Sequence, residues 1–303
     1  MGEHLPYKQE VAGSSPAYST INIMNKSKGL TSLPKTEADN YFFYAKTFEK
    51  NRNNGGKIPK RFVDKIICGD SEEILKRIPS YSVDLIFTSP PYNFGMEWAD
   101  FGQKSGWEDY FRKLKKIFRQ CVRILKHGGR LVVNIQPSFS DYIPSHHIIS
   151  NMIMNLGMIH RNEIVWDKNN YNAKYTSWGS WNSPSCPYLK YTWEFVEVFS
   201  KGNIKKKGER KNIDLTAEEF KEWVVGWWSI APERRMKELN HDAMFPEELA
   251  KRVIKLFSFK SDVVLDPFNG VGTTTKMAKE LGRKYIGIDI NQEYCQKAVK
   301  RTN

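Results

Sequence analysis

The sequence predicts a doubly wound α/β fold, in which helices cover both faces of a mostly parallel sheet. Residues 65–70, 83–90 and 129–135 are short apolar runs of the kind that form buried parallel strands. Segments 71–79 and 107–129 have the periodicity of amphipathic helices, and we expect the second to stop at its final Gly-Gly pair. This alternation of strand and helix favours a parallel sheet over an all-helical or all-β fold.

The middle of the sequence departs from this alternation. Residues 161–168 and 193–202 still resemble strands, but the stretch 168–240 also holds an aromatic loop, a basic run and a tryptophan-rich segment. The first sixty residues are polar and irregular, which is typical of a loose arm. Those before Met24 resemble translated upstream sequence, because Met24 opens a more ordinary start. The expected division is an arm at 1–60, one half of the α/β domain at 61–167, an insert at 168–240 and the other half at 241–303.

The composition favours a polyanionic partner. Of the 303 residues, 47 are Lys or Arg and 34 are Asp or Glu, which gives a net charge of +13. Basic side chains displace the counterions condensed on phosphates, so this charge is compatible with nucleic-acid binding. No apolar run reaches the roughly 18 residues that a membrane helix needs, and the N-terminus has no signal-peptide core. We expect a soluble, cytoplasmic protein with no membrane partner.

Neither the cysteines nor the histidines predict a metal site. The four cysteines lie far apart and form no CxxC pair, which favours reduced thiols over a disulfide framework. The six histidines show no ligand spacing. The adjacent His146 and His147 would point to different faces of a helix, and we interpret them as surface residues. We therefore expect no metal.

A glycine-containing loop predicts a cofactor site. It runs from Asp266 to Thr275, directly after an apolar strand and directly before a helix. Gly270 lets the backbone turn tightly, and the helix start offers free N–H groups. Asp289 ends the next expected strand, at the distance where an acidic residue grips the ribose of a nucleoside cofactor. A nicotinamide cofactor is disfavoured, because the loop reads GVGTTT where a GxGxxG pattern is usual.

A second motif, Thr88–Asn93, lies at the carboxyl end of an expected strand, where ligands of open α/β sheets bind. The amine of a nucleobase is a poor nucleophile, because its lone pair is delocalised into the ring. Hydrogen bonds from this amine to the Ser89 hydroxyl and the Pro90 carbonyl would localise the lone pair. The two prolines stiffen the loop, and Tyr92 offers a flat face for an extruded base. Taken alone, the same motif could be a rigid turn that caps the strand.

Together, the two motifs resemble those of the amino-group DNA methyltransferases of restriction–modification systems, in the permuted β arrangement. The SPPY motif at Ser89–Tyr92 precedes the FxGxG motif at Phe268–Gly272, and the resemblance covers roughly residues 62–301. It implies a seven-stranded, Rossmann-like, circularly permuted methyltransferase fold with S-adenosylmethionine as cofactor. It also implies a small target-recognition insert at 168–240, duplex DNA as substrate, and a prokaryotic, nucleoid-associated enzyme. A cognate restriction endonuclease would be a functional partner, while the recognised site and the oligomeric state stay open.

The resemblance also implies roles for particular residues. A flipped base would receive the methyl group directly, without a covalent enzyme intermediate. The catalytic residues would be Ser89, Pro90, Pro91 and Tyr92. The cofactor-binding residues would be Asp70, Phe245, Pro246, Asp266, Pro267, Phe268, Gly270, Gly272, Thr273, Thr274 and Asp289. Asp70 would contact the adenine of the cofactor, and Phe245 with Pro246 would line its methionine end.

Aromatic and basic residues of the insert are candidates for DNA contact. Trp178 and Trp181 lie in a Gly/Ser-rich loop and could line the target-base pocket or the DNA groove. The basic run is a candidate for phosphate contact, although such runs are usually solvated turns. Its residues are Lys205, Lys206, Lys207, Arg210 and Lys211. Trp223 and Trp227 have helical spacing, which favours core positions over stacking on DNA.

Other activities fit the sequence less well. A methyltransferase acting on carbon 5 of cytosine needs a Pro-Cys nucleophile, whereas Cys186 stands before a proline. An RNA base methyltransferase shares the chemistry but not the permuted order. A catalytically silent DNA-binding protein on the same fold would not need both motifs. Between the two amines, we expect that of cytosine, because adenine enzymes of the family usually carry Asp or Asn where Ser89 stands; adenine is the alternative.

Overall fold

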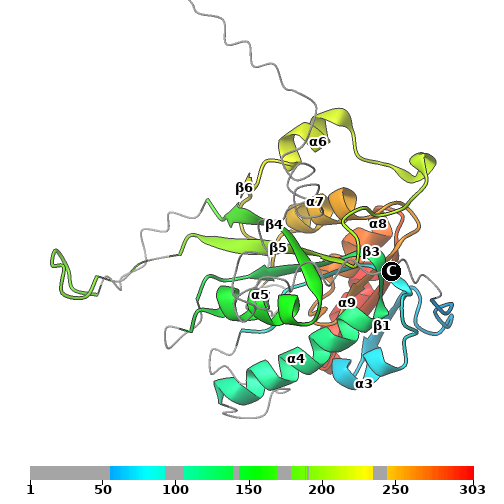
Figure 1. The fold of residues 1–303 in the computed structure, drawn as a ribbon, viewed down its shortest axis with the longest axis horizontal. Helices are drawn as coiled ribbons and strands as arrows, with labels where there is room; N and C mark the ends of the chain where they lie inside the picture. The colour runs from blue at the N-terminus through cyan, green and yellow to red at the C-terminus, as the bar shows by residue number, and fades with distance from the viewer. Residues whose placement is uncertain are drawn as a thin grey trace, which may run out of the picture. The chain divides into compact units, whose positions relative to one another are not determined.

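An eight-stranded sheet forms the centre of the structure, a computed structural model (Figure 1). The structure describes residues 55–92, 106–138, 143–169, 179–187, 189, 191–234 and 244–303. The strands are β1 (Lys65–Cys68), β2 (Val83–Thr88), β3 (Leu125–Ile135), β4 (Met158–Asp167), β5 (Trp193–Lys201), β6 (Trp227–Ser229), β7 (Val263–Asp266) and β8 (Lys284–Asp289). The helices are α3 (Ser71–Lys76), α4 (Trp107–Ile124), α5 (Ser145–Asn155), α6 (Ala217–Trp223), α7 (Glu247–Phe257), α8 (Thr273–Glu280) and α9 (Gln292–Thr302).

The strand order confirms a doubly wound, permuted α/β fold. The order is β1-β8-β7-β2-β3-β5-β4-β6, and only the two pairings of β5 are antiparallel. The two strands nearest the end of the chain, β7 and β8, therefore lie between β1 and β2. Ligands of open α/β sheets bind at the carboxyl ends of the strands where the order reverses, and here that point lies between β7 and β2.

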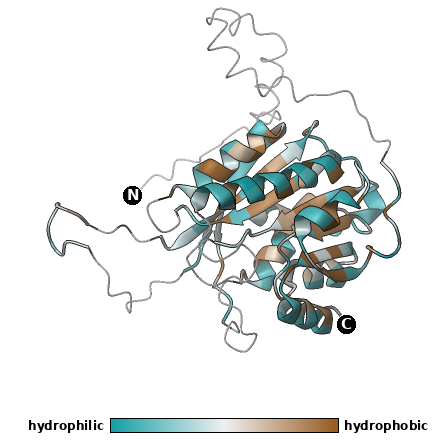
Figure 2. Cartoon of the chain, turned by 90° about the horizontal axis from the view of Figure 1, so that it is seen from below, coloured by the Kyte–Doolittle hydropathy of each residue, from teal (hydrophilic) through white to brown (hydrophobic). Residues whose placement is uncertain are grey.

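Two hydrophobic cores lie on opposite faces of the sheet. Alternate residues of β2 divide between them: Ile86 packs with α3, α4 and α5, whereas Leu85 and Phe87 pack with α7 and α8. This alternation follows from the two-residue repeat of a strand. Figure 2 shows the hydrophobic colour concentrated along the strands and the hydrophilic colour on the outer sides of the helices. Among the described residues, no helix is both long and apolar enough to cross a membrane.

Four features of the fold differ from the sequence predictions. Helix α4 ends at Ile124, before the Gly-Gly pair, because Leu125 is already extended and pairs with Val83 in the sheet. The expected insert at 168–240 contains β5, an internal strand, so this stretch is not a single insertion. The short β6 adds an eighth strand to the expected seven. Of the expected arm, residues 1–54, including Met24, lie outside the described residues, and Ile58 packs into the core.

The tryptophans near α6 do not share one helix face, and the expectation of core positions is confirmed for Trp223 but wrong for Trp227. Helix α6 ends at Trp223, and Trp227 begins β6. Trp223 and Trp228 are buried, whereas the side chain of Trp227 is 59% exposed. Because successive residues of a strand point to opposite faces, burial of Trp228 leaves Trp227 in solvent.

A buried ion pair fastens the segment between β5 and α6 to the carboxyl-terminal half. The guanidinium of Arg283, which is fully buried, donates two hydrogen bonds to the Asp214 carboxylate. It also donates to the carbonyls of Ser258 and Leu281, at 2.7 Å each. The positive charge of Arg283 is thus surrounded by acceptors for several N–H groups. A planar guanidinium can donate to all of them, whereas the ammonium of a lysine cannot.

We expect Asp214→Ala to lower the free energy of unfolding by about 3–5 kcal/mol, because Arg283 would remain buried without its counter-charge. The matched control is Glu209→Ala, which breaks the exposed pair with Lys211 and should cost less than about 1 kcal/mol. Urea titrations of both variants measure the difference. Equal losses would show that the buried ion pair contributes no more to the free energy of unfolding than the exposed pair.

Candidate active site

A cavity lies at the carboxyl edge of the sheet, where β2, β7 and β8 end. Its walls come from the loops that follow these strands, from the start of α3, from α4 and from the segment before α7. The lining residues are Asp70, Ser71, Ser89, Pro90, Pro91, Tyr92, Lys113, Ile117, Met244, Phe245, Asp266, Pro267, Phe268, Asn269, Gly270, Val271, Thr273, Asp289 and Ile290. Both sequence motifs therefore meet at the reversal point of the strand order.

The cavity gathers all four expected catalytic residues and most of the expected cofactor residues. Pro246, Gly272 and Thr274 stay outside the lining. The residues that sequence reasoning missed are Ser71, Lys113, Ile117, Met244, Asn269, Val271 and Ile290. Most of these directly follow or precede a residue that a motif identified. Their positions next to the motifs could therefore have indicated that they line the cavity. Lys113 and Ile117 come from α4, where no motif marks them.

Asp266 holds the loop that follows β7 to the end of β2. Its carboxylate accepts hydrogen bonds from the hydroxyls of Thr88, at 2.6 Å, and Thr274, at 2.7 Å, and from the N–H of Phe268. Burial raises the pKa of Asp266 to about 6, despite these hydrogen bonds. Thr274 is fully buried and acts on the loop through Asp266, not through the cavity.

Asp289 shapes the opposite wall of the cavity. Its carboxylate accepts the N–H of Gly270 at 2.6 Å and the N–H of Asn291 at 2.9 Å. Gly270 has a φ of 50°, a left-handed conformation that favours glycine. Gly272 has a φ of 88°, and a Cβ there would lie 2.8 Å from the Cβ of Ala298 on α9. Gly272 therefore serves the close packing of α8 against α9.

The third wall is charged. The side chain of Asp70 caps α3 by accepting the N–H of Glu72 at 2.7 Å, and its other oxygen lies 3.1 Å from Nζ of Lys113. The neighbouring Ser71 donates its hydroxyl hydrogen to the carbonyl of Pro267. This contact links the start of α3 to the loop after β7. Asp70 is thereby oriented by two partners while it remains part of the lining.

Tyrosine hydroxyls fix the loop Ser89–Tyr92. Tyr110 of α4 donates to the carbonyl of Pro91 at 2.8 Å, and Oγ of Ser89 lies 3.5 Å from the hydroxyl of Tyr92. Tyr92 is buried and donates to Oε2 of Glu194 at 3.2 Å. Burial and the charge of Glu194 raise the pKa of Tyr92 well above its ordinary value, so its phenol stays protonated.

Glu194 is a buried carboxylate that the sequence analysis did not single out. It is the second residue of β5 and accepts a hydrogen bond from the side-chain amide of Asn134 on β3. Lys168, which follows β4, supplies its counter-charge at 2.5 Å. Three strands therefore converge on one carboxylate beneath Tyr92. The available signal was the presence of two glutamates, Glu194 and Glu197, in a strand rich in apolar residues.

The expected DNA contacts are not all near the cavity. Trp178 lies outside the described residues, and Trp181 is 75% exposed. Lys206 bonds to Asp84 at 3.0 Å and to Asp262 at 3.1 Å, so its ammonium is engaged within the protein. Asp84 and Asp262 mark the amino-terminal ends of β2 and β7, the edge of the sheet opposite the cavity. These ion pairs correct the expectation that Lys206 contacts phosphate. Lys205, Lys207, Arg210 and Lys211 are exposed and belong to the same segment.

Three features together define the class of protein. They are the cavity at the reversal point of the strand order, the glycine loop whose Gly270 N–H donates to Asp289, and the loop Ser89–Tyr92. They are the features of an S-adenosylmethionine-dependent methyltransferase with a Rossmann-like fold. Residues 83–300 match the family model described as DNA methylase, and the chain belongs to this family of amino-group DNA methyltransferases of the restriction–modification type. It uses S-adenosylmethionine as its cofactor.

Known proteins support this assignment. The type II methyltransferase M.BglII of Bacillus subtilis is 31% identical over 249 residues, which cover 78% of this chain and 68% of its own length. The DNA adenine methyltransferase YhdJ of Escherichia coli (strain K12) is 33% identical over 261 residues, 80% of this chain and 85% of its own. The structure of a DNA modification methylase from Thermus thermophilus, TTHA0409, complexed with S-adenosyl-L-methionine, superposes with a TM-score of 0.63 at 30% identity and covers 78% of this chain and 92% of its own.

The cavity suits this cofactor chemically. Carboxylates of Asp70 and Asp289 stand at its walls as acceptors for amine and hydroxyl hydrogens, and Phe245, Phe268 and Ile290 supply apolar surface. A nucleoside needs both kinds of contact, because its base is flat and apolar on its faces while its sugar is polar. The lining therefore offers what the cofactor requires.

We expect Asp289→Ala to weaken binding of S-adenosylmethionine by about 1–3 kcal/mol, the cost of leaving buried hydroxyls without an acceptor. Asp289→Asn should lose less, because one acceptor oxygen remains for the N–H of Gly270. Glu280→Ala, on the exposed side of α8, is the control. Calorimetric titration of each variant gives the dissociation constants. A value for Asp289→Ala equal to that of the control would contradict the assignment.

Proposed function

We propose that this enzyme methylates the exocyclic amine of cytosine at one recognised site in duplex DNA, after the base has rotated out of the helix. One observation carries the proposal: Ser89, Pro90 and Tyr92 line the same cavity as the glycine loop and Asp289. A base held at the first group of residues would face a cofactor held at the second. Methylation of a base inside the stack is sterically excluded, which is the reason for rotation.

The cofactor would be held from three sides. Asp289 would accept hydrogen bonds from the ribose hydroxyls, and Asp70 would accept one from the adenine amine. Phe245 would border the methionine end, whereas Pro246, which the resemblance also implies, lies outside the cavity lining. S-adenosylmethionine supplies an electrophilic methyl group on a sulfonium centre. The remaining residues of the loop, Asp266–Thr274, would hold the backbone in the shape that the cofactor contacts.

The catalytic loop would prepare the amine for attack. The Ser89 hydroxyl and the Pro90 carbonyl would each accept one amine hydrogen, which holds the nitrogen lone pair toward the methyl group. Tyr92 would stack on the base with a ring whose hydroxyl is anchored on Glu194. Because the Pro91 carbonyl is fixed by Tyr110, the acceptors are positioned before the base arrives.

The choice of cytosine depends on Ser89. A serine hydroxyl is shorter than the carboxylate or amide that adenine enzymes of the family usually carry there, and it can donate as well as accept a hydrogen bond. The second candidate is the exocyclic amine of adenine. Its support is the similarity to YhdJ, a DNA adenine methyltransferase.

Substrate recognition would come from the segments on either side of β5, within residues 168–192 and 202–240. The exposed Trp181 is a candidate for contact with DNA. Residues 61–167 would form the catalytic half of the enzyme and residues 241–303 the cofactor half. A cognate restriction endonuclease that cuts the same unmethylated site would be its functional partner.

We expect Ser89→Ala and Tyr92→Ala to abolish methyl transfer while S-adenosylmethionine binding stays nearly intact, because both side chains would face the base. Ser229→Ala on β6, far from the cavity in the strand order, is the matched control. Transfer of radioactive methyl groups to DNA and calorimetric cofactor titration measure the two properties separately. Undiminished turnover in Tyr92→Ala would remove this residue from the catalytic group.

The methylated base can be identified directly. We expect nucleosides prepared from enzyme-treated DNA to contain N(4)-methylcytosine, resolved by mass from N(6)-methyladenine. DNA incubated with the Ser89→Ala variant is the control for methylation already present. Recovery of methylated adenine alone would refute cytosine as the target and leave the transfer chemistry standing.

A further inference from the structure

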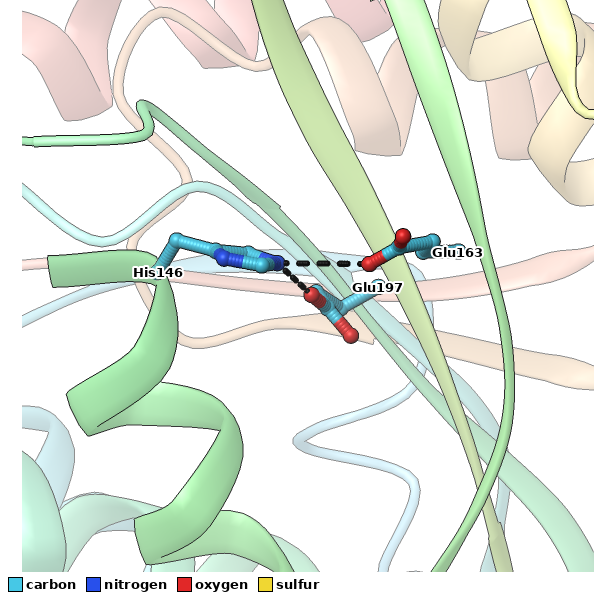
Figure 3. Close-up of side chains that lie close together, drawn as sticks. All are labelled: His146, Glu163 and Glu197. Atoms are coloured by element: carbon cyan, nitrogen blue, oxygen red, sulfur yellow. Dashed lines mark ion pairs between the residues drawn. The ribbon is translucent and has the colours of Figure 1, made fainter. Parts of the chain in front are cut away.

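A cluster of histidine and glutamate side chains lies on the sheet away from the cavity. His146 comes from the first turn of α5, Glu163 from β4 and Glu197 from β5 (Figure 3). Nitrogen and carboxylate oxygen atoms of the three residues all lie within 4.8 Å of one another. None of the three lines the cofactor cavity, and the proposed methyl transfer uses none of them.

The register of the sheet places the two carboxylates opposite each other. Glu163 pairs directly with Glu197 across the antiparallel strands β4 and β5. Like charges in this position repel each other unless a cation lies between them. A register irregularity between His160 and Asn162 also turns His160 to the same face, where its Nε2 bonds to Oε2 of Glu197 at 3.0 Å.

His146 does not donate a hydrogen bond to both of these carboxylates. Its Nε2 lies 3.4 Å from Glu163 and in close contact with Oε1 of Glu197, and Figure 3 shows it directed at both. Yet Nε2 of His146 and Oε1 of Glu197 are buried and make no hydrogen bond of acceptable geometry. Glu197 is only 1% exposed, so water does not compensate its oxygen. An imidazole N–H can satisfy one acceptor at a time, whereas a metal ion accepts electron pairs from all three atoms.

We propose that His146, Glu163 and Glu197 bind a divalent transition-metal ion, for which zinc is the best match, and that this ion fastens α5 to the β4–β5 pair. One imidazole and two carboxylates are ligands that zinc accepts, with a fourth position left for water. Ligand atoms roughly 2.1 Å from a tetrahedral ion are about 3.4 Å apart. The His146–Glu163 separation has this value, whereas the contact between His146 and Glu197 is shorter and would have to lengthen around an ion.

The surroundings support such a site. The hydrogen bond from His160 orients Glu197, as partners of metal-binding carboxylates commonly do. The ring of His146 stacks on Phe195 with centroids 4.0 Å apart, which fixes its plane. The Glu163 side chain is 46% exposed, so an ion can enter from solvent. The earlier interpretation of His146 as a surface residue is wrong, since its side chain is 12% exposed, whereas His147 is exposed as expected.

The test uses the untagged full chain after dialysis against a chelator, with Zn²⁺ and Co²⁺ as probes. The variants are Glu163→Gln and His146→Gln, and the matched control is His147→Gln on the same helix turn. Glu163→Gln keeps the size of an exposed side chain, so it should fold even if His146→Gln does not. Competition with a chelating indicator gives zinc affinity and stoichiometry, thermal unfolding gives stability, and visible absorption of Co²⁺ reports its ligand geometry.

We expect the wild type and His147→Gln to bind one zinc ion that raises the thermal midpoint, with a Co²⁺ spectrum of four-coordinate type. Glu163→Gln and His146→Gln should lose at least about tenfold in affinity, together with the shift in midpoint. Binding retained unchanged in both variants would place zinc elsewhere, for example at the exposed Cys68 or Cys186, and overturn the proposal. An unfolding transition of the wild type that responds to neither zinc nor chelator would overturn it as well.

Discussion

The hydrogen bond between Thr88 and Asp266 joins the last residues of two adjacent strands that are 178 positions apart in the chain. It lies between β2 and β7, where the strand order reverses, and it connects the loop that carries Ser89 to the loop that carries Gly270. Burial of a carboxylate without hydrogen-bond donors is costly, and the three hydrogen bonds that Asp266 accepts offset this cost. The position of Ser89 relative to Gly270 therefore depends on this contact.

The two motifs could be located from sequence because each follows a strand whose apolar pattern is unambiguous. Parallel strands bring their carboxyl ends to one edge, so Ser89 and Gly270 were expected to meet without knowledge of any side-chain contact. Glu194 could not be found in this way. Its link to Tyr92 spans 102 positions and depends on the rotamers of two buried side chains, for which no periodicity exists. The end of α4 was misplaced for a related reason: pairing of Leu125 with β2 overrides the helical preference of the residues before the glycines.

The histidine–glutamate cluster could not be located from the sequence either. His146 and Glu197 come from α5 and β5, and only the insertion of one residue in β4 turns His160 and Glu163 to the same face. Ligand spacing along the sequence is informative when one element supplies several ligands. Here three elements supply one each, so a pattern search finds nothing. Buried polar atoms that make no hydrogen bond are then the better guide, as Oε1 of Glu197 illustrates.

The insertion of β7 and β8 between β1 and β2 has a consequence for the growing polypeptide. A ribosome releases β1 and β2 early, but these strands are not neighbours in the sheet, and the two strands that separate them emerge last. Until then, the β2 edge and the β1 edge stay without hydrogen-bond partners, and Thr88 has no Asp266 to contact. The nascent chain therefore carries the loop Ser89–Tyr92 before Gly270 and Asp289 have been synthesised, and the cavity between them cannot form until β7 and β8 are in place. Such distant pairings also slow folding.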